Sequence, residues 1–279
     1  MRSVKIALAV LLASSLHLVS VQAAGNPESI ANAETQISIL FTRMGASNAD
    51  TDKKRINDSI VQLMETTLQI SGSMDYPFTL LAKMGKISSS DAKIRIYTWN
   101  LQWNDGTNTY FGFLQYKTNS KEEIKQVFLN DRSAEIQDAS QGILSPSQWY
   151  GMLIYEIVET KDDGHVYYTL LGLDNQDLFV SCKIVDVLYF DDHNEPVFGK
   201  LIFHYKNKLI CRLIFQYSAK VKMSLKWNSK MKMIIFDHLA PPSSSYTGNY
   251  AYYGPDFSYD GLRFEEGRWE LVEKVDVRN

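Results

Sequence analysis

The stretch HVYYTLLGLDNQDLFVSCKIVDVLYF, residues 165–190, decides the fold of this chain. Val180, Cys182 and Ile184 alternate with polar residues in its second half, and this period of two is typical of a β-strand with one buried face. Asp174-Asn175 interrupts the pattern with residues that favour turns. The stretch therefore predicts two strands, at 165–173 and 178–190, joined by a short turn.

The same pattern extends in both directions from this stretch. Further strands are predicted at 149–159, 197–205, 208–218, 221–227, 230–237 and 267–277, with short turns rich in Asp, Asn and Gly between most of them. Parallel crossovers need a dozen or more residues, so these short connections favour antiparallel neighbours. We expect a mainly β (α+β) fold, an antiparallel meander that forms a sandwich or an open barrel.

The N-terminal part of the chain has a helical period instead. Apolar residues recur at helical spacing from Ile30 to Met44 and from Ile56 to Thr67, with Gly45 and Gly72 behind them. Two helices with a short connection are expected to pack as an antiparallel pair against the sheet. The predicted organisation is a signal peptide at 1–23, a helical segment at 24–90 and an antiparallel β domain at 91–279. The segment 121–144 is compatible with either a short helix or an irregular strand.

The first 23 residues have the layout of a secretory signal peptide. Arg2 and Lys5 precede an apolar run that is too short to span a bilayer, and small residues follow at 21–24. We expect export to the periplasm, the cell surface or the medium. No other stretch is apolar enough to cross a membrane, so no membrane span is expected after the signal is removed.

Charge and composition narrow the classes of partner. Without Arg2 and Lys5 the chain keeps 27 basic and 32 acidic side chains, a net charge of −5. Nucleic-acid binding needs a concentrated basic face, so no nucleic-acid partner is expected. Lys220, Lys222 and Lys226 recur at alternate positions, which is typical of a solvated strand face. No cofactor motif occurs, and nothing in the sequence indicates an oligomeric state.

The two cysteines, Cys182 and Cys211, lie on the apolar sides of predicted strands. In a simple meander the strand at 197–205 would separate them by about 9–10 Å. A disulfide needs Cα atoms within about 7 Å. We therefore predict two buried free thiols.

The residues with the clearest catalytic potential lie near the C-terminus. Asp237-His238 ends a strand, and Asp256 and Asp260 occur in the Gly- and Pro-containing string 254–261. Together these four residues could form the site of a carboxylate-based glycan hydrolase. Asp256 and Asp260 could instead share a Ca²⁺ ion. Two consecutive turns are the simpler interpretation of the string, and no metal site is predicted.

Aromatic residues offer a different kind of site. Trp149, Tyr150 and Tyr253 could furnish a stacking platform for a sugar ring or a protein. Adjacent residues on a strand face opposite sides, so in the pair Trp149-Tyr150 one ring is expected to enter the core.

Several strings together resemble a known group of sequences. They are Trp149-Tyr150-Gly151, Tyr168 to Gly172, Pro196 to Gly199, Phe236 to Leu239, Tyr253 to Asp256 and Ser258 to Gly261. This pattern resembles an uncharacterised family of exported proteins from Bacteroidetes-type Gram-negative bacteria. The resemblance covers roughly the last 130 residues and implies export into a Gram-negative envelope. It implies no activity and no site residue.

The sequence thus favours an exported, non-catalytic protein that binds a glycan or another protein of the bacterial envelope. The glycan hydrolase is the first alternative, and a calcium-stabilised interaction module is the second. A hydrolase should gather two or more of the carboxylates in a concave pocket. A binding protein should instead show an exposed aromatic patch or groove.

Overall fold

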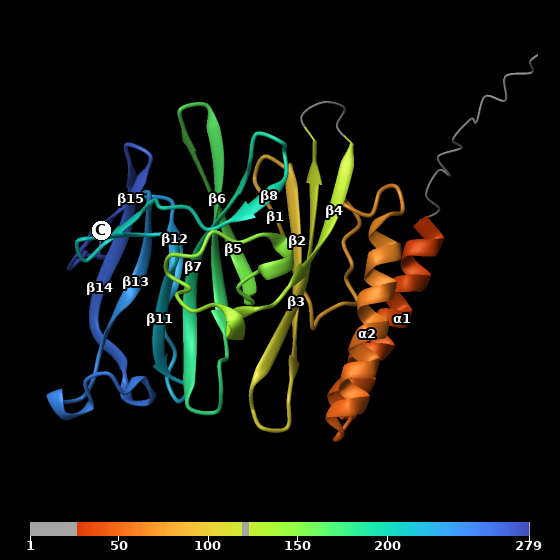
Figure 1. Cartoon of the computed structure of the whole chain (residues 1–279), viewed down its shortest axis with the longest axis horizontal. Helices are drawn as coiled ribbons and strands as arrows, with labels where there is room; N and C mark the ends of the chain where they lie inside the picture. The colour runs from red at the N-terminus through yellow and green to blue at the C-terminus, as the bar shows by residue number, and fades with distance from the viewer. Residues whose placement is uncertain (1–26, 119–122, 279) are drawn as a thin grey trace, which may run out of the picture.

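The computed structural model describes residues 27–118 and 123–278. The predicted signal peptide, residues 1–23, lies outside the described residues. Two helices and three open sheets follow one another as four layers, with the helices at one end (Figure 1). We call the sheets helix-side, central and outer, in order of distance from the helices. A mainly β fold with antiparallel sheets and two N-terminal helices confirms the predicted class, and the sheets stack as a sandwich.

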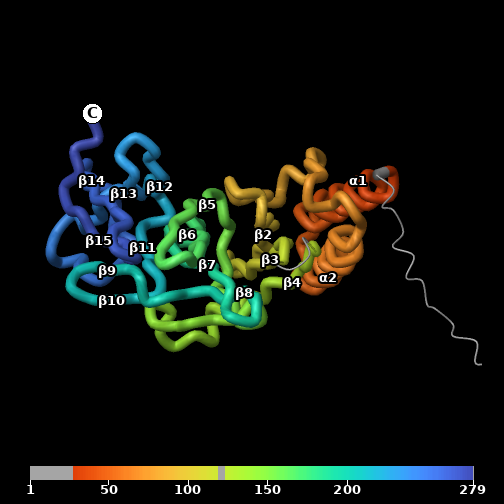
Figure 2. Tube along the Cα trace, turned by 90° about the horizontal axis from the view of Figure 1, so that it is seen from above, coloured from red at the N-terminus to blue at the C-terminus, as the bar shows by residue number. Residues whose placement is uncertain are grey.

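The helical layer is formed by α1 (Pro27–Ala46) and α2 (Asp50–Leu68), which lie side by side (Figures 1 and 2). Ile37 of α1 and Ile60 of α2 are completely buried and share a core with Trp99 of the sheet beneath. The predicted helix pair is therefore confirmed. α2 has Ala49 at its N-cap with no side-chain hydrogen bond, and Asp50 lies in its first turn.

The helix-side sheet is a meander of four neighbouring strands, β1 (Gly85–Ser88), β2 (Ile94–Gln102), β3 (Asn108–Lys117) and β4 (Ile124–Asn130). Tyr97 and Trp99 face the helices, while Ile94 and Ile96 face the central sheet. β1 begins inside the segment 24–90 that was expected to be helical. The ambiguous segment 121–144 contains β4 and then the single 3₁₀ turn η1 (Ser133–Glu135).

The central sheet contains the stretch 165–190. Its strands are β5 (Leu153–Asp162), β6 (His165–Asp174), β7 (Val180–Phe190) and β11 (Leu213–Ser218) in the order β11-β7-β6-β5, and β8 (Pro196–Phe198) also pairs with β7. Both faces are covered, because Leu170 packs toward the helix-side sheet and Leu171 toward the outer sheet. The predicted bounds of β6 and β7 agree with the structure to within two residues.

The outer sheet has the order β10-β9-β15-β14-β13-β12. Its strands are β9 (Phe203–Tyr205), β10 (Lys208–Ile210), β12 (Leu225–Asn228), β13 (Met233–Ala240), β14 (Gly254–Glu265) and β15 (Arg268–Val272). β15 pairs in parallel with β9 and so closes a connection across more than 60 residues. The predicted single strands at 197–205 and 208–218 are each divided between the central and outer sheets.

Cys182 and Cys211 are buried free thiols, as predicted. The reason given for their separation was wrong, because no strand lies between β7 and β11. The two strands pair directly, with Cys182 opposite Gln216. Cys211 comes five residues before Gln216 and two before β11 begins, so an extended chain would place it on the order of 16 Å along the strand direction.

The string 254–261 is not a pair of turns, so that interpretation was also wrong. It lies in β14, which pairs with β13 on one side and β15 on the other. A register shift between Asp237 and Leu239 accommodates the Gly- and Pro-containing residues as a bulge. The turn-forming composition thus marks an irregular strand.

Candidate functional site

The segment between β13 and β14, residues 241–253, forms a surface loop that we call the tyrosine loop. Its sequence, PPSSSYTGNYAYY, contains no charged residue. Two 3₁₀ turns, η3 (Ser244–Tyr246) and η4 (Tyr250–Tyr252), order the loop. Tyr246 stacks on Tyr252, with ring centroids 4.4 Å apart and an interplanar angle of 28°, and Tyr250 lies 5.0 Å from Tyr253. The four phenol rings therefore form two contacting pairs.

Hydrogen bonds fix the tyrosine loop to the end of the central sheet. The backbone N–H of Ser218, at the end of β11, donates to the carbonyl of Tyr253 at 3.0 Å. The N–H of Gly248 donates to the Tyr253 hydroxyl at 3.1 Å. Tyr253 is therefore an anchor of the loop, while Tyr246, Tyr250 and Tyr252 remain exposed.

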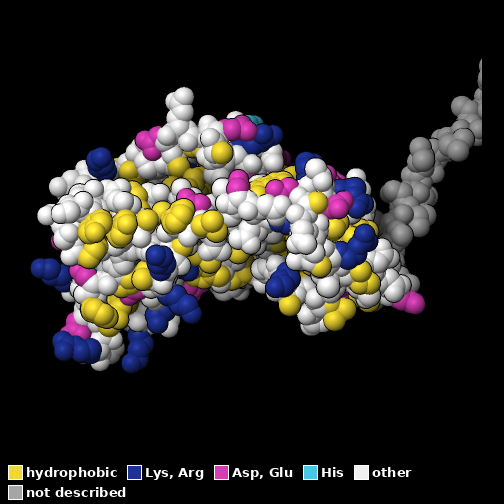
Figure 3. All heavy atoms as spheres, turned by 90° about the horizontal axis from the view of Figure 1, so that it is seen from below, with side chains coloured by type: hydrophobic (Ala, Val, Ile, Leu, Met, Phe, Trp, Pro, Cys, Tyr) yellow, Lys and Arg dark blue, Asp and Glu magenta, His cyan; other side chains and the backbone are white. Residues whose placement is uncertain are grey.

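Apolar side chains from two other connections continue this surface. We call the whole set the apolar strip: Leu178, Phe179, Val221, Tyr246, Tyr250 and Tyr252, all exposed. Phe179, in the turn before β7, is 64% exposed, and its carbonyl accepts a hydrogen bond from the N–H of Ala219 at 2.8 Å. Seen from below, yellow side chains gather over these connections in a continuous band (Figure 3). Contiguous exposed apolar patches are a common feature of interaction sites, so the apolar strip is the candidate site of this protein.

His238 and Asp260 form the closest pair among the predicted catalytic residues. His238 Nδ1 lies 2.7 Å from Asp260 Oδ2, and the other carboxylate oxygen accepts the N–H of Lys274 at 3.0 Å. Asp260 is buried, whereas His238 is partly exposed. Such a carboxylate orients an imidazole and leaves its second nitrogen toward solvent.

The other two carboxylates form no hydrogen bond to this pair, although Asp256 lies within electrostatic range of His238. Asp237 accepts the backbone N–H of Ser224 at 2.6 Å and so holds the approach to β12. Asp256 accepts the N–H and the hydroxyl of Ser258, and that hydroxyl bond lowers the pKa of its carboxyl. A glycosidase acid needs the opposite shift, a raised pKa.

Other parts of the described surface are concave. Four hollows of 430–740 Å³ are centred near Glu266, Ser145, His204 and Asn48. None of these four is lined by the predicted catalytic residues. No group of three His, Cys, Asp or Glu side chains in the described residues is arranged to hold a metal ion. The geometry therefore favours neither the hydrolase nor the calcium module.

The predicted aromatic platform is not assembled. Trp149 is completely buried between the helix-side and central sheets, with its ring centroid 6.5 Å from that of Phe198. Tyr150 is half-buried beside the Arg212 guanidinium, and burial raises the pKa of its hydroxyl. Tyr253 belongs to the tyrosine loop instead. Trp149 is a core residue and cannot stack on a ligand, whereas Tyr150 packs against the core and is partly exposed.

Sequence reasoning missed the residues that do form an exposed surface. The useful signal was the composition of 241–253, since Tyr, Ser, Gly and Asn without charge is the composition of a binding loop. Leu178 and Phe179 had no such signal, because exposed apolar residues in a turn look like strand residues in a sequence. Among the described residues, no helix is both long and apolar enough to cross a membrane.

Fold and surface together define a three-sheet β protein with a helical layer and an exposed aromatic loop. Comparison with protein-family models, with curated proteins and with solved structures gave no match. Function is therefore argued from the surface itself.

Proposed function

We propose that this chain is an exported, non-catalytic binding protein of the bacterial envelope, whose ligand is a glycan or another protein. The apolar strip is its binding surface. The single observation that supports this proposal most is the exposed, stacked pair Tyr246–Tyr252 within a continuous apolar band.

The chemistry of the tyrosine loop fits such a role. Tyrosine offers a large contact area with few rotatable bonds, so ordering it on binding costs little conformational entropy. Ser243, Ser244, Thr247 and Asn249 supply hydroxyl and amide groups between the rings. Because the loop carries no charge, the contacting part of the ligand should be neutral.

Export and an envelope location rest on the N-terminal sequence and on the resemblance to exported Bacteroidetes-type proteins. Both belong to this proposal. A binding protein of the envelope needs no catalytic centre, and the hydrogen bonds of Asp237 and Asp256 go to Ser224 and Ser258 rather than to the His238–Asp260 pair.

The test is one incubation with two measurements. The protein is run through gels that contain neutral glucan, mannan, xylan or peptidoglycan fragments, and the release of reducing ends is measured in parallel. Binding without release is expected. The double variant Tyr250→Ser/Tyr252→Ser should weaken retention by about tenfold or more, because buried aromatic anchors dominate interface energies.

A matched control removes exposed apolar area far from the strip. Ile39→Ser/Leu80→Ser does so in and beside the helical layer and should leave retention unchanged. If no glycan is retained, a photo-crosslinker at position 250 should capture one envelope protein reproducibly, and a crosslinker at position 39 should not. Release of reducing ends that disappears in Asp260→Asn would instead establish the hydrolase.

A further inference from the structure

A cluster of lysines lies beside the apolar strip but is separate from it. Between Lys220 and Lys232 the chain has five lysines and no acidic residue. We call them the basic edge: Lys220, Lys222, Lys226, Lys230 and Lys232, all exposed. In the part of the chain that the structure describes, none of the five forms an ion pair.

The basic edge opposes the charge of the rest of the molecule. The whole chain, Arg2 and Lys5 included, has 24 other basic residues and 32 acidic ones. Outside the edge its net charge is therefore −8. Five unpaired positive charges are therefore concentrated within 13 residues of an acidic protein. This asymmetry predicts an anionic partner for the edge.

The sheet geometry places these lysines together on an outer surface. β12 is the last strand of the outer sheet, and Met223 and Leu225 point into the core. Lys226 lies opposite Ile235, which faces away from that core. Lys222 lies in the connection before β12 and is also exposed. Dark blue side chains gather at the lower left in the view from below (Figure 3).

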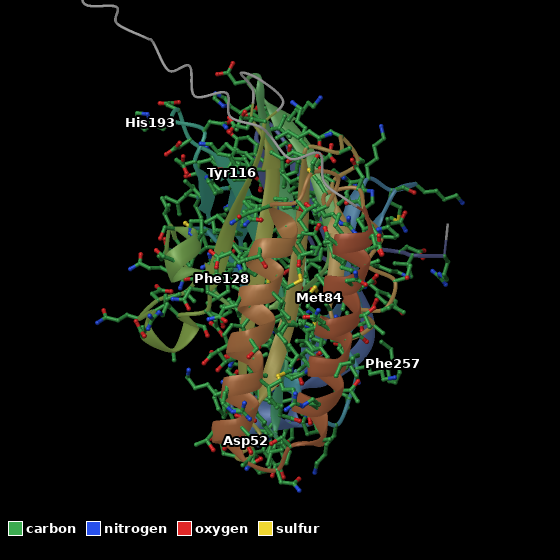
Figure 4. All side chains as sticks on the ribbon, turned by 90° about the vertical axis from the view of Figure 1, so that its right-hand side faces the viewer. Asp52, Met84, Tyr116, Phe128, His193 and Phe257 are labelled. Atoms are coloured by element: carbon green, nitrogen blue, oxygen red, sulfur yellow. The ribbon has the colours of Figure 1, made fainter. Side chains whose placement is uncertain are left out.

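Phe257 protrudes beside the basic edge. It is 95% exposed and has a φ of 71° in the bulge of β14, an unusual conformation for a bulky residue. It projects into solvent from the side of the molecule (Figure 4). Asp237 lies between Ser224 and Tyr259, and Lys222 and Phe257 each come two residues earlier. Phe257 and Lys222 therefore belong to segments on the two sides of β13, namely the bulge of β14 and the approach to β12.

Among the described residues no nearby carboxylate forms an ion pair with the five lysines, although Glu156 accepts the N–H of Trp227 at 3.0 Å. Asp237 is hydrogen-bonded to the N–H of Ser224, Asp256 to Ser258, and Asp260 to His238 and Lys274. Each carboxylate therefore has polar partners other than the five lysines.

We propose that the basic edge and Phe257 dock the protein on the surface of an anionic phospholipid bilayer. Lysines beside a membrane are attracted to lipid phosphates, and an exposed aromatic ring inserts at the headgroup level. The lysines lie on a strand and its two flanking connections, and they line none of the four hollows described above. An exposed set of lysines outside these hollows, with a protruding ring, suits a bilayer better than a chain-like polyanion, which needs a groove.

This inference goes beyond the proposed function and rests on different residues. Val221 of the apolar strip lies between Lys220 and Lys222. Docking through the basic edge would therefore hold the strip close to the membrane surface, where envelope ligands are concentrated.

The test measures co-sedimentation of the protein, purified in the processed form that the cell produces, with vesicles. Vesicles of phosphatidylglycerol and phosphatidylcholine in equal parts are compared with pure phosphatidylcholine. The native protein should partition at least about tenfold more strongly to the anionic vesicles, and this preference should fall as salt rises from about 50 to about 300 mM.

Three variants locate the binding surface. Substitution of the five edge lysines by Gln should abolish the preference for anionic vesicles. Substitution of five other exposed lysines, Lys83, Lys93, Lys161, Lys206 and Lys208, should change it less than about twofold. Phe257→Ser should leave the salt dependence unchanged and weaken binding about threefold or more. Its position in solvent means that folding should survive.

Three results would overturn the proposal. The first is equal binding of the native protein to both vesicle types, and the second is an equal loss in both lysine variants. The third is binding of native protein and Phe257→Ser alike to polygalacturonate without vesicle binding, which would assign the edge to an acidic polysaccharide. Each of these results leaves the glycan and crosslinking tests of the apolar strip unaffected.

Discussion

Arg212 and Asp186 form a salt bridge in the central sheet, with Nε 2.7 Å from Oδ2 and both side chains completely buried. Arg212 also donates to the carbonyl of Ala139 at 2.6 Å and so ties the segment before β5 to the sheet. Removal of one partner of such a buried pair is strongly destabilising, because the other partner is left as an uncompensated charge.

We therefore predict that Asp186→Asn lowers the free energy of unfolding by about 3–5 kcal/mol. The double variant Asp186→Leu/Arg212→Met should be less destabilised than Asp186→Asn or Arg212→Met, because it buries no charge. Urea unfolding at neutral pH measures all four proteins. A loss of less than about 1 kcal/mol in Asp186→Asn would show that water reaches this pair.

Asp174, at the end of β6, predicts a pH dependence of stability. Burial raises the pKa of its carboxyl to about 6, and the nearby carboxylates of Asp131 and Asp177 act in the same direction. In the unfolded chain an Asp carboxyl has a pKa near 3.9. At a pH between these two pKa values the folded state holds a proton that the unfolded state lacks. The carboxyl therefore destabilises the fold increasingly as the pH rises from about 4 to 6, and by a constant amount above that.

Asp174→Asn should therefore raise the free energy of unfolding at pH 7.5 by up to the order of 3 kcal/mol. The gain should shrink as the pH falls toward 4. Urea unfolding of both proteins across this range measures the difference, and Asp192→Asn, at an exposed turn, is the matched control. A gain that is constant with pH would show that Asp174 does not titrate in this range.

The two cysteines should be unreactive in the folded protein. Burial raises the pKa of both thiols, so the nucleophilic thiolate is scarce at neutral pH. Iodoacetamide should add to neither residue under native conditions and to both after denaturation without reductant, as measured by mass spectrometry. No adduct after denaturation would demonstrate a disulfide and contradict the free thiols.

Phe257 offers a test of strain at an exposed position. A φ of 71° costs a non-glycine residue roughly 1–2 kcal/mol, while glycine adopts it freely. Because the ring contributes little to the core, Phe257→Gly should raise the thermal midpoint by a few degrees. Phe257→Ala keeps the backbone strain and should leave the thermal midpoint unchanged. A lower midpoint in Phe257→Gly would show that the ring supports the fold.

The sequence predicted those elements whose pattern is local. The helices and strands β6 and β7 have clear periods, because each buries one or two faces along its own length. The order of strands was harder, since β11 pairs with β7 across the intervening β8, β9 and β10. Such pairings depend on which apolar faces meet in the folded core, and residue spacing carries little of that information.

The candidate sites show the same limit. Asp260 and His238 were selected together and do meet, because β13 and β14 are neighbours. Trp149 was selected as a ligand platform, yet its bulk places it in the core. The apolar strip combines three separate connections, and only the fold brings Phe179 beside the tyrosine loop.

We propose that the apolar strip contacts the ligand. Hydroxyl-radical footprinting measures the solvent access of its side chains directly, by comparing the protein in intact envelopes with the purified protein. We expect oxidation of Phe179, Tyr246, Tyr250 and Tyr252 to fall by about threefold or more in the envelope, while His238 reacts equally in both samples. Unchanged oxidation of these rings, with protection at His238 instead, would contradict this account.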